Sequence, residues 1–290
     1  MNHNVFRSGL NSGFKALLTP VLIAWVTAFW AAFLALPCAF ALDSAKEASK
    51  SVSLTEAEGF EPRLGTYYYT ARWDGTEAFE ATVSVQKQDD LYRILVDSRT
   101  SGIIDFIFRI RYRGEGFLRS EDFAPLKTVI TEEKRKRSKE TQLYYLEDGG
   151  IEVVQTSTKK QAEPRTTSRT VRPETEVLEP FSATFLARGF DWQVGEVQQF
   201  EVFTGKDTYL VTLVCQEKTI VEESGTATDA WVIRPAVRNL SKPEKKSKIT
   251  DVKLYISADP HKDLLKMKSK TKIGTIVLKM KQFVPQETEI

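Results

Sequence analysis

The chain has 290 residues, of which 41 are lysine or arginine, 39 are acidic and two are histidine. This near balance of charge argues against nucleic acid as the partner, because phosphate binding draws on a net basic surface. The length allows one large β domain or two smaller ones after any leader is removed.

The N-terminus has the features of an export signal. Arg7 and Lys15 precede the apolar run ALLTPVLIAWVTAFWAAFLAL, and Ala39 and Ala41 supply the small side chains that a signal peptidase needs. We therefore expect residues 1–41 to be a cleaved signal peptide and the mature protein to be periplasmic.

Two alternatives stay open for this leader. The apolar run reaches the roughly 20 residues needed to cross a bilayer, so an uncleaved inner-membrane anchor also fits. Cys38 raises the question of lipidation, although Pro37 stands where lipoprotein processing needs a small, flexible residue.

Cleavage would leave 39 basic and 39 acidic residues, with Cys215 as the remaining cysteine. A lone cysteine in the apolar stretch VTLVCQE is most simply a small core residue.

The next segments divide the mature chain into a lead and a folded part. Residues 42–62 are polar and have no sustained period, which is typical of a flexible lead. Residues 63–286 alternate apolar and polar side chains, and we expect a single β-rich domain there. Two aromatic and β-branched runs flank Asp74-Gly75, the pair that supplies positive φ in a tight hairpin turn.

Further strands follow in the same style. Residues 104–110 alternate apolar and polar side chains and predict a strand. The run LYYLEDGGIEVVQ predicts a second hairpin with Asp148-Gly149-Gly150 at its tip. Between them lies the densest charge run, EEKRKRSKE, at 132–140. We interpret it as a solvated strand edge, with a polyanion site as the alternative.

The alternation breaks twice. Residues 156–177 lose the apolar face and predict a long exposed crossover. In EPFSATFLARGFDW, residues recur at helical spacing, Pro180 can open a helix, and Gly189 can end it in a left-handed cap. Strands resume beyond this one short helix, with a hairpin about Gly205-Lys206. We predict a mainly β fold: an antiparallel barrel, half-barrel or sandwich.

These pieces together resemble a known family. The aromatic strand into Trp73-Asp74-Gly75, the helix 182–188, Gly195 before a strand and the turn SADP with Lys266 beyond it occur in the order found in the bacterial envelope family catalogued as domain of unknown function 3108. Tyr255 stands where that family leads us to expect tryptophan. The resemblance implies export and this fold, and it brings no catalytic residue, cofactor or metal ligand.

His261 is the histidine that remains in the mature chain, and it lies in SADPHKD between two alternating runs. Proline fixes φ in such a connection, and Asp259 before it can cap the turn by accepting from a backbone amide. A general base needs an orienting partner and a nucleophile, and a metal site needs several strong ligands. We therefore interpret His261 as a turn residue, and we predict no catalytic residue, metal site or cofactor.

The aromatic hairpin offers one candidate for ligand binding. Alternation places Tyr67, Tyr69 and Trp73 on one face and Tyr68 with Arg72 on the other. If one face is the core, Tyr68 lies on the second face, where a curved sheet could hold an apolar ligand in its concavity. The alternative is that strands simply favour aromatic residues and that another element covers this face.

Three hypotheses on function follow. The first is a noncatalytic carrier or binding protein for a lipid-like or other hydrophobic ligand. The second is a structural or protein-interaction component of the envelope, acting through exposed strand edges or the basic crossover. The third, an enzyme, has no recognisable constellation of residues to support it. An apolar cavity of roughly 300 Å³ or more would favour the first, and a filled barrel with an exposed edge the second.

Overall fold

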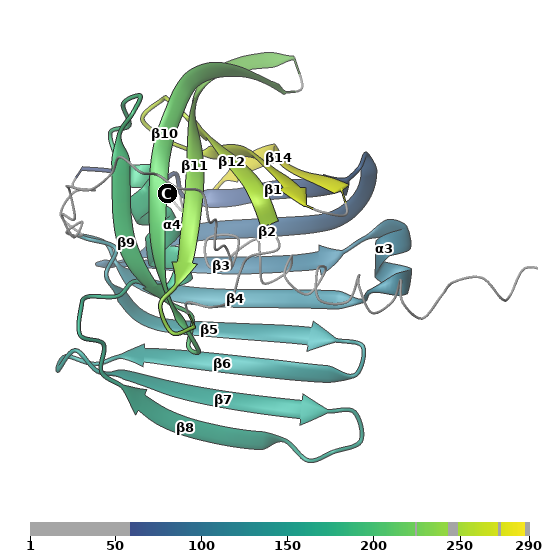
Figure 1. Ribbon diagram of the computed structural model, residues 1–290, viewed down its shortest axis with the longest axis vertical. Coiled ribbons are helices and arrows are strands. Elements are labelled where there is room, and N and C mark those ends of the chain that lie inside the picture. Colours follow the sequence, from purple (N-terminus) through teal and green to yellow (C-terminus); the bar gives the residue numbers. More distant parts are fainter. Residues whose placement is uncertain (1–58, 224, 243–248, 272–273, 288–290) are drawn as a thin grey trace, which may run out of the picture.

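The computed structural model describes residues 59–223, 225–242, 249–271 and 274–287. Within these ranges the chain forms fourteen strands and two helices (Figure 1). The elements in chain order are β1 (Gly65–Trp73), β2 (Thr76–Gln88), β3 (Leu91–Thr100), α3 (Gly102–Ile107), β4 (Ile110–Arg119), β5 (Pro125–Lys134), β6 (Arg137–Tyr145), β7 (Ile151–Lys159), β8 (Arg165–Val171), α4 (Pro180–Gly189), β9 (Val197–Phe203), β10 (Thr208–Glu223), β11 (Thr226–Asn239), β12 (Ile249–Ser257), β13 (Leu264–Thr271) and β14 (Gly274–Pro285).

All fourteen strands belong to one antiparallel sheet. Its order is β8-β7-β6-β5-β4-β3-β2-β1-β14-β13-β12-β11-β10-β9, so two meanders meet where β1 pairs with β14. The sheet is not closed, and β8 and β9 are its two edge strands. The prediction of a mainly β, antiparallel fold is confirmed, and its form is an open, barrel-like sheet.

The sheet curls around α4, which is buried along almost its whole length. In Figure 1, β9, β10 and β11 cross over the strands of the first meander, and α4 lies behind them. Phe181, Phe185 and Leu186 are buried with side chains from both meanders in the main core cluster. The large aromatic side chains of α4 therefore take the space that an internal ligand would need.

Two of the predicted hairpins depend on local turn chemistry, and both are present. Asp74 and Gly75 have φ of 44° and 84° and join β1 to β2. Gly149 has a φ of 77° in the connection of β6 to β7, where Gly150 donates its amide to the Asp148 carboxylate. These turns need positive φ, which explains why short polar residues and glycine occupy them.

The helix α4 begins where the sequence predicts, but the predicted left-handed cap at Gly189 is wrong. Gly189 is the last helical residue, and Phe190 follows with an extended backbone, φ −61° and ψ 143°. The Lys262 Nζ donates to the carbonyls of Gly189 and Phe190, at 2.8 and 3.1 Å. A side chain from a distant turn thus satisfies carbonyls that a local cap would otherwise satisfy.

The predicted strand across residues 104–107 is also wrong, since these residues belong to the short helix α3. Gly102 has a φ of 54°, which turns the chain out of the direction of β3. The Asp105 carboxylate accepts from Thr100 Oγ1 at 2.5 Å and from Arg111 Nη1 at 2.6 Å. These bonds hold the helix between β3 and β4, against the local alternation of the sequence.

The long crossover predicted at 156–177 is in part a pair of strands. β7 continues to Lys159, and the stretch RTTSRTV forms the edge strand β8. An edge strand needs no buried face, so its polar alternation of arginine and threonine is compatible with a sheet.

The leader prediction for residues 1–41 lies outside the described residues, as does nearly all of the predicted lead. No helix among the described residues is long and apolar enough to span a bilayer.

Candidate functional site

The SADPHKD turn is confirmed as the connection of β12 to β13. The Asp259 carboxylate accepts from the backbone amides of His261 and Lys262, at 2.9 and 3.2 Å. His261 is exposed, and its carbonyl oxygen accepts from Arg188 Nη2 at 3.0 Å. The contact of His261 with the core is therefore made by the main chain.

The residue of this turn that reaches the core is Asp263, which is 2% exposed. Its Oδ1 accepts from Arg188 Nη2 at 2.9 Å and from Tyr67 Oη at 2.8 Å. Its Oδ2 accepts from Arg63. One carboxylate thus connects β1, α4 and the β12–β13 turn.

Electrostatics within this buried cluster keep Tyr67 protonated. Burial raises the pKa of Tyr67; the nearby Arg188 lowers it and the Asp263 carboxylate raises it. The phenol therefore remains a hydrogen-bond donor to the carboxylate. A carboxylate that accepts from two arginines and a tyrosine has its lone pairs engaged, so the arrangement favours a structural tie over acid–base chemistry.

A second buried carboxyl, Glu179, caps the start of α4. Its two oxygens accept from the amides of Phe181 and Ser182, at 2.9 and 2.6 Å. Burial raises the pKa of Glu179 to about 7, and the two amide bonds oppose that change without overcoming it. The group has the pKa of a general acid or base, yet it lies in the packed interior at 0% exposure.

The described residues offer little support for a metal site or a reactive thiol. The described ranges contain no group of three or more His, Cys, Asp or Glu side chains that could hold a metal ion. Cys215 is buried in β10, and burial raises the pKa of its thiol to about 11. Such a thiol stays protonated and behaves as a small core residue.

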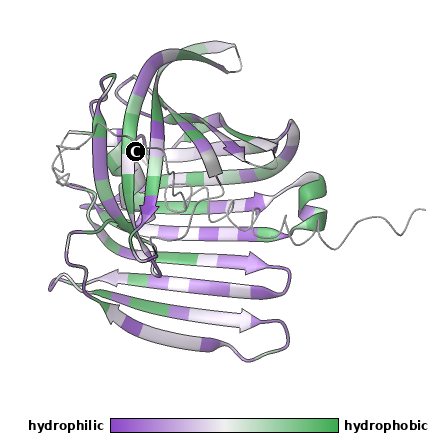
Figure 2. Cartoon of the chain, viewed as in Figure 1, coloured by the Kyte–Doolittle hydropathy of each residue, from purple (hydrophilic) through white to green (hydrophobic). Residues whose placement is uncertain are grey.

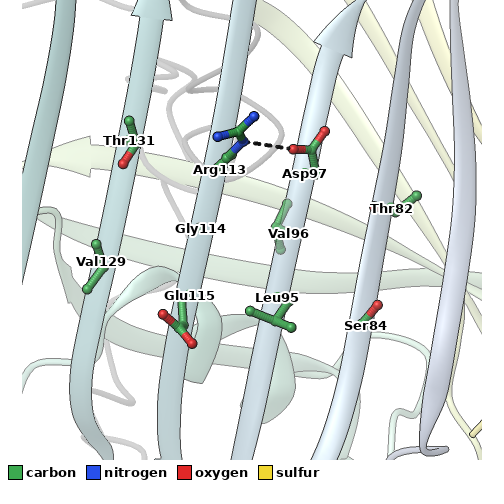
Figure 3. Close-up of a pocket in the computed structure, with 10 residues that line it drawn as sticks. All are labelled: Thr82, Ser84, Leu95, Val96, Asp97, Arg113, Gly114, Glu115, Val129 and Thr131. Carbon is green, nitrogen blue, oxygen red and sulfur yellow. Dashed lines mark hydrogen bonds and ion pairs between the residues drawn. The ribbon is translucent and has the colours of Figure 1, made fainter.

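The outer face of β2 to β5 carries a shallow depression of about 360 Å³. We call it the outer depression; Figure 3 shows its ten lining residues. Leu95 and Val129 provide apolar surface, while Asp97 and Arg113 form an ion pair at 3.2 Å. The depression is open to solvent and mixed in chemistry.

Tyr68 lies beside this depression. Its side chain is 41% exposed, on the face opposite the buried Tyr67 and Tyr69. Across the sheet it is paired with Thr82, which lines the outer depression. The predicted ligand candidate is thus on the outer face, away from the side filled by α4.

The charge run EEKRKRSKE is not a strand edge, as predicted, but the tip of the β5–β6 hairpin within the sheet. Because side chains alternate, one face of β5 to β8 collects the cations. This face is the one that carries the buried Leu143 and Val153 nearer the core. We call its cationic residues the basic face; they are Lys134, Arg137, Lys139, Lys159, Arg165 and Arg169.

Cross-strand register places these cations close together. Lys134 is paired with Arg137, which is paired in turn with Lys159. Burial lowers the pKa of Lys139, and nearby positive charges lower it further, although Glu132 opposes them. Those charges belong to Lys206, Lys134 and Arg137.

The fold and these sites define an open, barrel-like β protein whose interior is filled by a helix and whose charged surface lies beyond that filled region. The sequence profile of the family described as "Protein of unknown function (DUF3108)" matches residues 68–281, so the chain belongs to this family. No curated protein matches the chain.

A solved structure shares the fold. It is the crystal structure of a beta-barrel-like protein of domain of unknown function DUF1849 from Brucella abortus. The TM-score is 0.50 at 10% sequence identity, over 78% of this chain and 98% of that one. At this identity the likeness concerns the fold alone.

Sequence reasoning missed both the Asp263 cluster and the basic face. The first depends on contacts between residues nearly 200 positions apart, such as Tyr67 and Asp263, which no local pattern reveals. The second had a signal: Arg165 and Arg169 are an even number of positions apart, as are Arg137 and Lys139. Assigning 165–171 to a strand would have shown that each pair shares a face.

Proposed function

We propose that this chain is an exported, noncatalytic protein of the cell envelope that binds an acidic, extended segment of a partner protein. The observation that carries the proposal is β8, an edge strand with two arginines on the basic face. Among the described residues β8 pairs only with β7, so one side of its main chain is available. Another polypeptide strand can pair with such a row of edge amides and carbonyls through its own main chain.

Charge selects the kind of strand that would fit. Arg165 is exposed, and Lys139 and Lys159 lie on the same face of the neighbouring strands. An added strand with acidic residues at alternate positions would place its carboxylates next to these cations. Main-chain pairing would then provide affinity, and the charges would set specificity and register.

Site-specific photocrosslinking in envelope fractions tests this proposal. A photoreactive amino acid at Thr167, which lies between the two arginines on β8, should form an adduct whose crosslinked peptide is acidic. A probe at Thr131, on the outer face of β5, is the control. The charge reversal Arg165→Glu should abolish the Thr167 adduct, while Arg72→Glu, at an exposed position on β1, should leave it intact.

Two outcomes would remove the edge-strand proposal. An adduct that survives Arg165→Glu would show that the basic face does not select the partner. Equal labelling from Thr167 and Thr131 would show that the partner protein does not prefer the edge strand β8.

The outer depression favours a second candidate, the predicted binding of a hydrophobic ligand. Leu95 and Val129 offer apolar surface, and Tyr68 adds a ring at the adjoining strand. Tyr68→Ala should weaken the saturable binding of a fluorescent acyl probe and leave the melting temperature nearly unchanged. Equal probe binding by both proteins, or no saturable binding by either, would eliminate this site.

A further inference from the structure

The helix α3 presents three large apolar side chains to solvent. Ile103, Phe106 and Ile107 are 64%, 80% and 50% exposed, whereas Ile104 is buried against the core. The helix stands at one end of the sheet, and Figure 2 shows its apolar colouring there. Grouped exposed apolar side chains of this size mark an interaction surface more often than isolated ones do.

Several bonds fix α3 in this position. Asp105 accepts from Thr100 and Arg111, and burial costs less than these bonds contribute, so the pKa of Asp105 falls to about 2. Arg135 Nη2 donates to the carbonyl of Phe106 at 2.7 Å. The apolar side chains are therefore held outward by an anchored helix.

Cations lie next to this apolar group. Arg135 belongs to the β5–β6 turn, and the next residue, Lys136, accepts a main-chain bond from Lys160 of the β7–β8 turn at 2.9 Å. A second open depression, of about 430 Å³, lies between these two turns. Its cationic lining residues are Lys134, Arg135, Lys136, Arg137, Lys159 and Lys160. We call α3 and these two turns the α3 end.

Acidic residues at the α3 end do not cancel this charge. Asp105 is paired with Arg111, and Glu132 with Lys134. Glu133 and Glu163 are the other carboxylates near the two turns. The cations of the α3 end outnumber them, and Figure 1 shows both turns at the same end of the sheet as α3.

We propose that the α3 end docks on an anionic lipid bilayer, with Phe106, Ile103 and Ile107 entering the interface and the lysines and arginines contacting lipid phosphates. Basic side chains near an anionic surface are attracted to it, and apolar side chains add to the binding by insertion. The long basic side chains can reach the headgroups while the apolar ones go deeper.

A bilayer fits this surface better than a protein partner does. α3 has six residues and so is about 9 Å long, whereas a standard protein interface buries about 800 Å² on each partner. Three exposed apolar side chains with cations in the adjoining turns match the layered chemistry of a membrane surface, where apolar chains lie beneath phosphates. Docking by this end would leave the outward edge of β8 accessible.

Vesicle flotation with the purified chain tests the proposal. The chain should float with equimolar phosphatidylglycerol and phosphatidylcholine vesicles at a salt concentration of about 0.1 M, and remain unbound with phosphatidylcholine alone. The double variant Phe106→Ser, Ile107→Ser should lower the bound fraction by about fivefold or more. Lys136→Glu with Lys160→Glu should abolish binding, and Ile220→Ser, at an exposed apolar position of β10, should not change it.

Two further measurements separate a bilayer from a simple phosphate site. The variant Phe106→Trp should show a blue-shifted emission on mixing with anionic vesicles, because the indole enters an apolar layer. Inorganic phosphate should neither produce this shift nor displace the protein. Equal flotation with neutral vesicles, displacement by inorganic phosphate, or undiminished binding of the serine variant with unchanged melting temperature would each overturn the proposal.

Discussion

Asp263 shows at the scale of single residues how this fold tolerates a buried charge. The carboxylate lies at 2% exposure and is balanced by Arg188 and Arg63, with Tyr67 as a neutral donor. A buried ion pair contributes little by itself, because desolvation offsets the attraction between the charges. Removing one member is costly, since the remaining charge stays buried without its partner.

We predict that Asp263→Asn lowers the free energy of unfolding by about 3 to 5 kcal/mol, because it leaves Arg188 without its buried counter-charge. His261→Ala, two residues away, should change it by less than about 0.5 kcal/mol, because the side chain is exposed. Urea titrations followed by circular dichroism measure both. Similar losses for the two variants would contradict the structural role assigned to Asp263.

Among the elements, α4 determines whether this sheet has an interior that a ligand can enter. Pro180 and the helical spacing of apolar residues predict the helix. The structure buries side chains on several faces of this helix, so the sheet surrounds it. The carboxyl at its start is unusual, because helix N-termini normally favour the charged form of an acidic cap. In α4 the desolvation of Glu179 outweighs that effect.

This predicts a pH dependence. The pKa of Glu179 is about 7 in the folded protein against an ordinary value of 4.5, so the folded state binds more protons between these values. Its stability relative to the unfolded chain therefore falls as pH rises from about 4.5 to 7. The melting temperature of the wild type should drop by several degrees across this window, and Glu179→Gln should flatten the drop. An equal slope in the variant would refute the assignment.

The glycines of β4 allow α4 to approach the sheet closely. A Cβ at Gly116 would stand 2.7 Å from Phe181 Cδ2, and one at Gly114 would stand 2.7 Å from Phe181 Cζ. Neither glycine has a positive φ, so the requirement is for space.

Gly116→Ala should cost roughly 1 to 3 kcal/mol of stability, because the added methyl group overpacks against the Phe181 ring. Combining it with Phe181→Leu should recover stability relative to the sum of the two single changes. Thermal unfolding of the four proteins of this cycle measures the coupling. Additive losses would show that the contact does not limit the packing, and Arg113→Ala on the outer face of β4 serves as a near-neutral control.

At the scale of the whole molecule, the open sheet has two candidate binding regions beyond its filled core. The six cations of the basic face lie where the sheet extends past α4, and the apolar side chains of α3 stand at one end of it. An exported protein with these features can bind a membrane and a partner chain through different surfaces. The expectation of export rests on the leader sequence, residues 1–41.

We predict that the mature N-terminus is Leu42, in a periplasmic fraction, because Ala39 and Ala41 fit the subsites of the signal peptidase. N-terminal sequencing of the purified protein measures this. Ala41→Arg should block cleavage and retain the chain in the membrane fraction. Recovery of residues 1–41 intact on a membrane-embedded wild-type protein would establish the anchor alternative.

The sequence by itself determined the β class, the hairpins at Asp74-Gly75 and Asp148-Gly149-Gly150, and the position of α4. Each depends on a period or on a turn residue whose φ preference acts over a few positions. Only the tertiary structure decided that 104–107 coil into α3, that 165–171 form an edge strand and that α4 fills the sheet. These outcomes rest on contacts between distant residues, such as Arg135 with Phe106, Lys262 with Gly189 and Tyr67 with Asp263. Such contacts outweigh the conformational preference of a local sequence pattern, because they bury polar and apolar groups together. Which groups become buried depends on how the whole sheet folds.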